Sequence, residues 1–363
     1  MFLHAEQPAD IYKPRTPVAQ IWEQVIADFT AATALPKRSE YSEEDTGRVT
    51  SGAAYAMLGR TYWYNRDFEN VYKMLYVLVE GEQKGEYELD PDFATQWLNP
   101  NSNLRESIFE IQYVTNGKNW DESTGWNGVW FIPSSDGGYG FHLPTQHLLD
   151  AFDPEDPRIT WTFVRQGDQF VGNDFVTGDA NYPSRFFDRK HFVPMSETLN
   201  AASPVYPQDV EMTVYVIRYA DVLLMYAEAC LEKGDIVGAR KYLNQVRKRA
   251  RESSPLDAKR VIQKYVPDTK PTSLPDITSD NVAEVRLAIW NERRFEFACE
   301  GIRRMDLMQQ ERYGEIMTAV YSNGYATEDV DKGRYYTKER ELFPIPQNDI
   351  DLSRGALVQN PGY

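Results

Sequence analysis

Two stretches of the sequence, 168 residues apart, carry the same pattern of a helix, a short turn and a second helix. In each stretch an aspartate marks the turn, and small or apolar residues recur at matching places around it. The matched positions are Gly59 with Ala227, Asp67 with Asp235, Val71 with Ala239, Leu75 with Leu243 and Leu78 with Val246. A small residue on the first helix lets the second approach closely, as in tetratricopeptide-type hairpins. The sequence therefore predicts tetratricopeptide-like helical hairpins, although generic antiparallel helix packing would give part of this pattern.

The remaining periodicity also favours helices. Residues 18–29 place apolar side chains at positions i, i+3, i+4, i+7, i+8 and i+11, with Thr16 as a suitable N-cap and Pro17 as the first helical residue. Helical order is expected to resume at residue 214, and another long helix is expected over residues 281–310. Only residues 107–113 are typical of a strand. The predicted fold is therefore mainly α, with little β structure.

The chain changes character between residues 114 and 211, where glycine and proline recur every few residues. Four of the chain's eight tryptophans lie in this stretch, and such aromatic enrichment argues against disorder. Long loops inside a folded domain are otherwise usually functional. We expect a single domain over residues 1–363, with a helical scaffold over residues 16–113 and 212–363 and a loop-rich insertion over residues 114–211.

Charge and hydropathy exclude several classes of protein. Lysine and arginine number 39 against 55 aspartates and glutamates, a net charge of −16, so nucleic acid is not an expected partner. The most apolar stretch, residues 214–230, is interrupted by Arg218, Asp221 and Glu228 and is not expected to span a membrane.

Cysteine and histidine spacing gives no indication of a metal site or a cofactor. Cys230 and Cys299 lie far apart and are expected to be small buried side chains rather than ligands. None of the four histidines falls at the i, i+4 spacing of a helical zinc site, so no zinc centre is expected. They are His4, His142, His147 and His191.

The densest run of charges, residues 292–306, is expected to be structural. Helical spacing would pair Arg293 with Glu296, and Glu300 with Arg303 and Arg304. Paired carboxylates could serve a glycosidase, but an arginine within one turn lowers a carboxyl pKa and removes the proton donor that such catalysis needs. Nucleophile and phosphate-loop motifs are absent from the sequence, so no enzymatic activity is expected.

The candidate ligand site is a run in which rings alternate with short polar groups. A flat aromatic side chain beside an amide or carboxylate suits a sugar, which has apolar CH faces and polar hydroxyl edges. The alternative is that these rings pack the insertion onto the helices. The predicted ligand-binding residues are Trp120, Asp121, Trp126, Asn127, Trp130 and Tyr139.

Short motifs in a fixed order run from residue 47 to the end of the chain, each weak alone but specific as a set. They are Gly47-Arg48-Val49-Thr50, residues 106–113 (ESIFEIQY), Asp156-Pro157-Arg158, residues 217–229 (IRYADVLLMYAEA), residues 243–247 (LNQVR), residues 292–297 (ERRFEF), Pro344-Ile345-Pro346 and residues 359–363 (QNPGY). With this set the chain resembles the SusD/RagB family of surface nutrient-binding lipoproteins.

The resemblance implies a body of tetratricopeptide-like hairpins that lies as a lid over a SusC-like TonB-dependent outer-membrane transporter. Members capture oligosaccharides, or peptides in some branches, at the cell surface and do not catalyse a reaction. Their ligand contacts come from loops and follow no shared motif. A protein–protein scaffold without a small ligand, and a helical glycoside hydrolase, remain as alternative interpretations.

The start of the chain departs from the family pattern. Members usually begin with a signal peptide and a lipid-bearing cysteine, followed by a helical segment. No cysteine precedes Cys230, so we expect an N-terminally incomplete sequence whose lipid anchor, its only expected link to the membrane, is absent from this chain.

Overall fold

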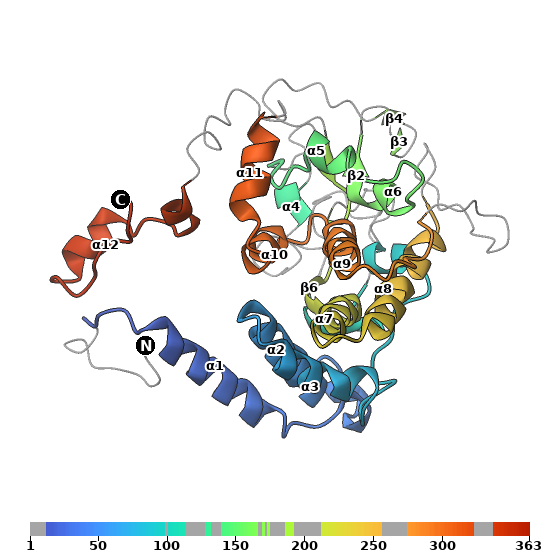
Figure 1. Cartoon of the computed structure of the whole chain (residues 1–363), viewed down its shortest axis with the longest axis horizontal. Helices are drawn as coiled ribbons and strands as arrows, with labels where there is room; N and C mark the ends of the chain where they lie inside the picture. Colours follow the sequence, from blue (N-terminus) through green and yellow to red (C-terminus); the bar gives the residue numbers. More distant parts are fainter. Residues whose placement is uncertain are drawn as a thin grey trace.

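The structure is a computed structural model of the whole chain. It describes residues 12–98, 101–113, 128–131, 139–165, 169–170, 173–174, 186–191, 212–255, 274–322 and 337–363. In this part of the chain, helices predominate and the strands form two-stranded sheets, so the prediction of a mainly α fold is confirmed (Figure 1). Trp120, Asp121, Trp126 and Asn127 lie outside the described residues.

Two helical hairpins form the centre of the scaffold. They are α2 (Ser51–Tyr64) with α3 (Phe68–Val79), and α7 (Tyr219–Glu232) with α8 (Ile236–Arg251). The first residues of α7 and α8 lie 168 positions after those of α2 and α3, as the sequence pattern predicts. The hairpins stack on each other through α3 and α7, and α9 (Val282–Glu296) covers the second hairpin (Figure 1).

The two turns are built alike. Arg66 and Gly234 adopt the left-handed backbone conformation, with φ of 59° and 86°. The next residue, Asp67 or Asp235, then caps the second helix by accepting a hydrogen bond from the backbone N–H of the residue three positions on. A Cβ atom at Gly59 would clash with Leu75, so the small residue is required where α3 approaches α2.

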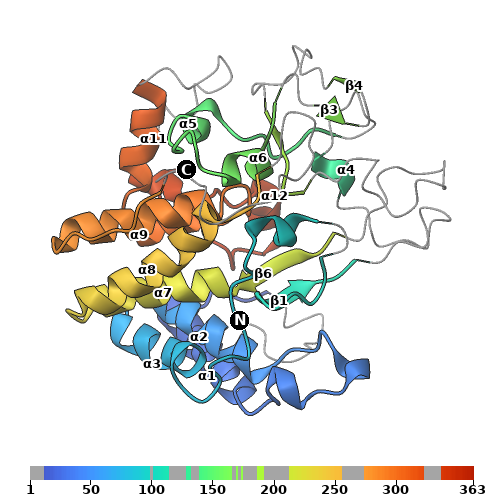
Figure 2. The same cartoon turned by 90° about the vertical axis from the view of Figure 1, so that its right-hand side faces the viewer.

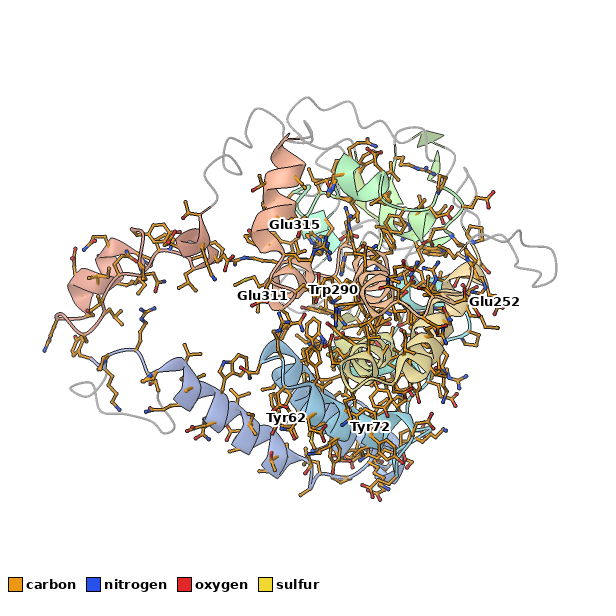
Figure 3. All side chains as sticks on the ribbon, in the orientation of Figure 1. Tyr62, Tyr72, Glu252, Trp290, Glu311 and Glu315 are labelled. Atoms are coloured by element: carbon orange, nitrogen blue, oxygen red, sulfur yellow. The ribbon has the colours of Figure 1, made fainter. Side chains whose placement is uncertain are left out.

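The main hydrophobic core lies between these helices. Side chains fill the space between the stacked helices (Figure 3). Tyr72 on α3 stacks on Tyr226 of α7, with ring centroids 5.0 Å apart. Leu75, Leu243 and Ile289 are fully buried. Full burial of a large apolar side chain contributes about 1.5–3 kcal/mol to stability. This core buries many such side chains and is therefore the principal stabilising feature of the scaffold.

Three helix boundaries differ from the sequence prediction. Helix α1 (Val18–Ala32) starts after Pro17 without a side-chain cap, and residues 214–218 form a strand before α7 begins. The long helix expected over residues 281–310 is divided into α9 and α10 (Arg303–Gln309), because Cys299 and Gly301 adopt left-handed φ values of 65° and 78°. Cys230 is buried in α7 as expected. The same prediction is wrong for Cys299, which is only partly buried because it lies in this break.

A strand pair brackets the insertion. Strand β1 (Ser107–Ile111) pairs antiparallel with β6 (Val214–Arg218), from Ser107 opposite Arg218 to Ile111 opposite Val214 (Figure 2). The chain therefore leaves the scaffold and returns to it at one place. The division of the single domain into scaffold and insertion stays a prediction, with which this pairing agrees.

The other elements are short. In the insertion they are α4 (Gly128–Phe131), α5 (Gln146–Leu149), α6 (Arg158–Thr162), and the strand pairs β2 (Phe163–Val164) with β5 (Phe187–Asp188) and β3 (Gln169–Phe170) with β4 (Asn173–Asp174). Elsewhere they are α11 (Tyr313–Ser322), α12 (Gln347–Leu352) and the 3-10 helices Arg38–Glu40, Glu43–Asp45, Phe93–Trp97 and Lys338–Glu341. Within the described residues, no helix has the length and apolar character needed to cross a bilayer.

Candidate functional site

Three exposed rings form a cluster on the insertion, here called the aromatic patch: Trp130, Tyr139 and Phe141. They are 48%, 54% and 54% exposed, respectively. Their ring centroids lie 5.2 to 6.0 Å apart, and each pair of planes is inclined by 18° to 37°. The patch lies at α4, well apart from the α2/α3 hairpin (Figure 2).

The backbone holds the patch together. The N–H of Phe141 donates to the carbonyl oxygen of Trp130 over 2.7 Å, which ties residues 139–142 to α4. Gly140 and His142 have φ values of 62° and 61°, so the chain turns on both sides of Phe141. Clustered, exposed aromatic rings present apolar surface to solvent, and such surface suits the CH face of a sugar ring.

The structure brings together two of the six predicted ligand-binding residues, Trp130 and Tyr139. It adds Phe141, which the sequence analysis missed although it lies only two residues beyond Tyr139. Trp161, another tryptophan of the insertion, is fully buried, and its indole N–H donates to the carbonyl oxygen of Ser254 over 2.7 Å. Trp161 therefore packs the insertion onto the scaffold, as the alternative interpretation proposes for such rings.

Behind the patch lies a group of two histidines and one aspartate. The Oδ2 atom of Asp188 is 3.0 Å from Nδ1 of His142 and 2.7 Å from Nδ1 of His191. Burial raises the pKa of Asp188, but the two imidazoles outweigh burial and lower that pKa well below its usual range. In turn, the hydrogen bond to Asp188 raises the pKa of His142. The ring of Phe131 packs on both imidazoles.

Lys190 ties this group to the scaffold. Its ammonium group is fully buried and donates to the carbonyl oxygen of Glu296 over 2.8 Å and to the carboxylate of Glu300 over 2.7 Å. The ammonium nitrogen also lies 4.6 Å from the ring centroid of Trp97. The segment that carries Asp188 and His191 is thus anchored to the end of α9.

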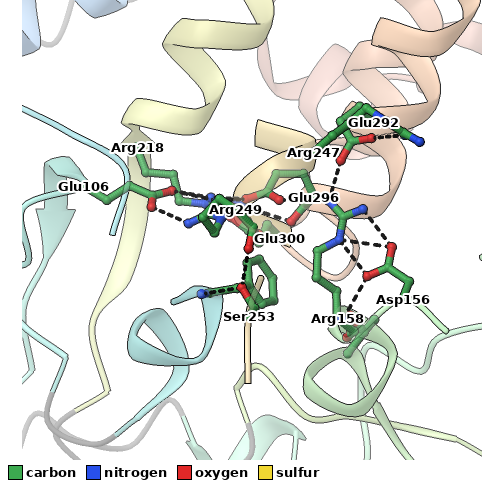
Figure 4. A network of polar contacts seen from close by, with 12 residues as sticks. Glu106, Asp156, Arg158, Arg218, Arg247, Arg249, Ser253, Glu292, Glu296 and Glu300 are labelled. Carbon is green, nitrogen blue, oxygen red and sulfur yellow. Dashed lines mark hydrogen bonds and ion pairs between the residues drawn. The ribbon is translucent and has the colours of Figure 1, made fainter. Parts of the chain in front are cut away.

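At the same end of α9 a buried network of charges joins scaffold and insertion (Figure 4). This ion cluster consists of Glu106, Asp156, Arg158, Arg218, Arg249, Glu292, Glu296 and Glu300. Arg218 binds Glu106 and Glu296 over 2.6 Å each. Arg158, from α6 of the insertion, binds Glu292 over 2.7 Å and Glu296 over 3.0 Å. The cluster therefore holds α6 against α9.

The structural role predicted for these charges is confirmed, but the predicted pairs within one helix are wrong. The observed partners are Asp221 and Asp306 for Arg293; Arg158, Arg218 and Arg249 for Glu296; and Arg218 and Lys190 for Glu300. Glu300 does not pair with Arg303 or Arg304 because α9 ends at Glu296 and the chain turns before Arg303. Arg293 and Glu296 both lie in α9, but their partners come from other elements. Burial raises the pKa of Glu296, but the three guanidinium groups outweigh it and hold that pKa far below its usual range. Glu296 therefore stays ionised and is unsuited to donate a proton.

Hollows elsewhere on the described residues have volumes of about 260 to 760 Å³. Of these four hollows, the largest is lined by residues of α10 and α11, including Tyr313, and another lies beside Tyr242 of α8. None of these four is lined by a ring of the aromatic patch. Each ring of the patch is about half exposed, so a ligand could contact several rings at once.

Comparison with known proteins agrees with the architecture. The family model described as the SusD family matches residues 105–363. A SusD-like protein of Bacteroides ovatus is 24% identical over 391 aligned residues, which cover 96% of this chain and 66% of the relative. The chain thus spans slightly less than two thirds of that relative's length.

Solved structures share the fold. A SusD homologue from Bacteroides thetaiotaomicron matches with a TM-score of 0.74 at 22% identity, covering 96% of this chain and 71% of that one. Surface glycan-binding protein A from the same species, in complex with laminarihexaose, matches with a TM-score of 0.67 at 22% identity, covering 96% and 72%. Because the family model spans more than half of the sequence and the architecture agrees, the chain belongs to the SusD family.

Proposed function

We propose that this protein binds an oligosaccharide on the aromatic patch without cleaving it, and delivers it to a SusC-like TonB-dependent outer-membrane transporter. The observation that carries the proposal is the exposure of three neighbouring rings at one place on the insertion. A protein with the same fold binds laminarihexaose, which makes a glucan a reasonable first ligand to test.

Two buried carboxyl groups of the scaffold, Glu296 and Glu228, are unsuited to catalysis. A glycosidase needs a proton-donating carboxylic acid next to the sugar. Glu296 is held ionised by its arginine partners. Burial raises the pKa of Glu228, but this carboxylate is 1% exposed and accepts hydrogen bonds from the indoles of Trp63 and Trp290 over 2.7 and 2.9 Å. Glu228 is therefore enclosed by the scaffold and out of reach of a sugar.

Location and delivery are the second part of the proposal. We place the protein at the cell surface, on the outer membrane, with the helical hairpins facing the transporter and the insertion facing the ligand. This arrangement rests on family membership and on the separation of α4 from the α2/α3 hairpin (Figure 2). Co-purification with a SusC-like transporter from the source membrane would test it.

Calorimetric titration tests the ligand assignment. The wild type is screened against laminarihexaose and a panel of other oligosaccharides, and the ligand it binds is then titrated into W130A, Y139A and F141A. Each substitution is expected to lower affinity about tenfold, because the removed ring gives up apolar contact area and a loss of about 1.4 kcal/mol is tenfold in affinity. Y76A is the matched control, since Tyr76 is a 44% exposed ring on α3, away from the patch.

Three results would contradict the proposal. Unchanged affinity in all three patch variants would show that the ligand does not bind at the patch. Binding of peptides but of no oligosaccharide would show that the ligand is a peptide rather than a sugar. Release of shorter sugars on long incubation would show that the protein is a hydrolase.

A further inference from the structure

The histidine–aspartate group behind the patch has the chemistry of a metal site. We propose that His142, Asp188 and His191 bind a divalent transition-metal ion such as Zn²⁺. One ligand atom from each residue lies within 4.8 Å of the other two. Two imidazoles and one carboxylate form a common ligand set for zinc and for other first-row metals. The sequence expectation of no zinc centre considered only histidines at helical spacing, whereas His142 and His191 lie 49 positions apart.

The distances suit a shared ion. Zinc bonds to histidine nitrogen and carboxylate oxygen are about 2.0–2.2 Å long, so neighbouring ligand atoms of a tetrahedral site lie about 3.3–3.6 Å apart. The observed separations from Asp188 Oδ2 are 3.0 Å to His142 and 2.7 Å to His191. An ion could therefore replace the hydrogen-bonded protons if each imidazole nitrogen moved away from Asp188 Oδ2 by about 0.3–0.9 Å. Binding would release protons to solvent, as it does at other histidine sites.

The backbone aims the ligands at one another. His142 has a φ of 61°, a left-handed conformation that is uncommon for residues with a side chain and that places its imidazole against Asp188. The other carboxylate oxygen of Asp188, Oδ1, accepts the backbone N–H of Lys190 over 2.9 Å. This hydrogen bond orients Oδ2 towards the imidazoles, as outer contacts do in known metal sites.

The surroundings shield the group without closing it. The ring of Phe131 lies 4.7 Å from that of His191, and the ring of Trp97 meets His191 edge-on at 6.3 Å. Asp188 is fully buried, while the side chain of His142 is 40% exposed and gives access from solvent. The nearby ammonium group of Lys190 opposes a cation, but Glu300 pairs with it directly.

A bound ion would join two parts of the insertion. His142 directly follows Phe141 of the patch, and Asp188 and His191 belong to the segment anchored to α9 through Lys190. Because only three residues would coordinate the ion, positions remain on it for water or for a group of a bound molecule. The site does not depend on sugar binding at the patch, so the two proposals can fail separately.

Titration of the untagged full chain with ZnCl₂ after EDTA treatment tests the proposal. The wild type is expected to bind one ion, and H142N and H191N are each expected to lower the affinity by more than about tenfold. Asparagine is chosen because it tolerates the left-handed conformation at position 142. The double variant H4N/H147N removes the other two histidines of the chain and is expected to bind like the wild type. Bound Co²⁺ should give a visible absorption band that H142N lacks.

Thermal melting in EDTA separates loss of the site from loss of the fold. Since His142 is partly exposed, the melting temperature of H142N in EDTA should be close to that of the wild type. Added Zn²⁺ should raise the melting temperature of H142N less than that of the wild type. If H191N fails to fold, H142N alone decides. The proposal is overturned if the wild type binds Zn²⁺ no more tightly than H142N, or if H4N/H147N abolishes binding.

Discussion

The ion cluster and the aromatic patch differ in how many of their groups are already paired with other groups of the protein. In the ion cluster, Arg218 and Glu296 are 1% and 0% exposed, and each has several partners of opposite charge. In the patch, three rings contact one another while about half of each remains exposed. The cluster contains charged groups, which could bind a ligand strongly, but these groups are already paired with one another. The patch has open faces, and those faces are what a ligand can contact.

The two regions are nevertheless connected. Lys190 binds Glu300 of the ion cluster, and its backbone N–H binds Asp188, which lies behind the patch. The cluster therefore acts on the patch by positioning the segment that supports it. Substitutions in the cluster should change stability first, whereas substitutions in the patch should change binding first.

The largest effect is expected for Glu296→Gln. The substitution leaves the buried guanidinium groups of Arg158, Arg218 and Arg249 without their shared carboxylate. Removing one partner of a buried ion pair typically lowers the free energy of unfolding by about 3–5 kcal/mol. Urea denaturation measures the change, with Asp276→Asn as the control.

Asp276 pairs with Arg251 over 2.7 Å, but its side chain is 51% exposed, so its loss should lower the free energy of unfolding by about 1 kcal/mol at most. Equal losses in the two variants would show that burial does not distinguish the ion cluster from surface pairs.

A smaller loss in the free energy of unfolding is expected when acid protonates Asp221, on α7. Burial raises its pKa, but Arg293 and Arg60 outweigh burial and lower the pKa to about 2, against an ordinary 3.8. A carboxyl with a lowered pKa stabilises the fold above its unfolded pKa, and this stabilisation is lost as pH falls towards the folded value. The shift corresponds to about 2 kcal/mol, lost between about pH 4 and pH 2. Asp221→Asn should flatten this part of the stability profile, and an unchanged acid slope would contradict the assignment.

The hairpins were predictable because their determinants are local. Apolar spacing, the small residue at Gly59 and the caps at Asp67 and Asp235 all lie within a few residues of the turns that they fix. The break between α9 and α10 was missed. It depends on a left-handed conformation at Cys299, a residue type that gives no such indication, and only Gly301 pointed to it.

The site was predictable only in part. Trp130 and Tyr139 were found because alternation of rings and polar groups is visible in the sequence, and extending the same pattern by two residues would have found Phe141. The partners of Glu296 and the meeting of His142 with His191 depend on how distant segments pack. Helical spacing therefore predicted the wrong ion pairs and gave no indication of the histidine–aspartate group.

The largest change in binding, with only a small change in stability, is expected for the double variant W130A/F141A. Both rings are about half exposed, so removing them gives up only part of the roughly 1.5–3 kcal/mol that full burial of a large apolar side chain provides. The free energy of unfolding should fall by about 1 kcal/mol, while binding of the oligosaccharide identified for the wild type should be lost. Urea denaturation and calorimetric titration on the same preparation measure both. A loss of stability as large as that of Glu296→Gln would place the patch among the structural contacts, because rings that hold the insertion in place are not free to hold a ligand.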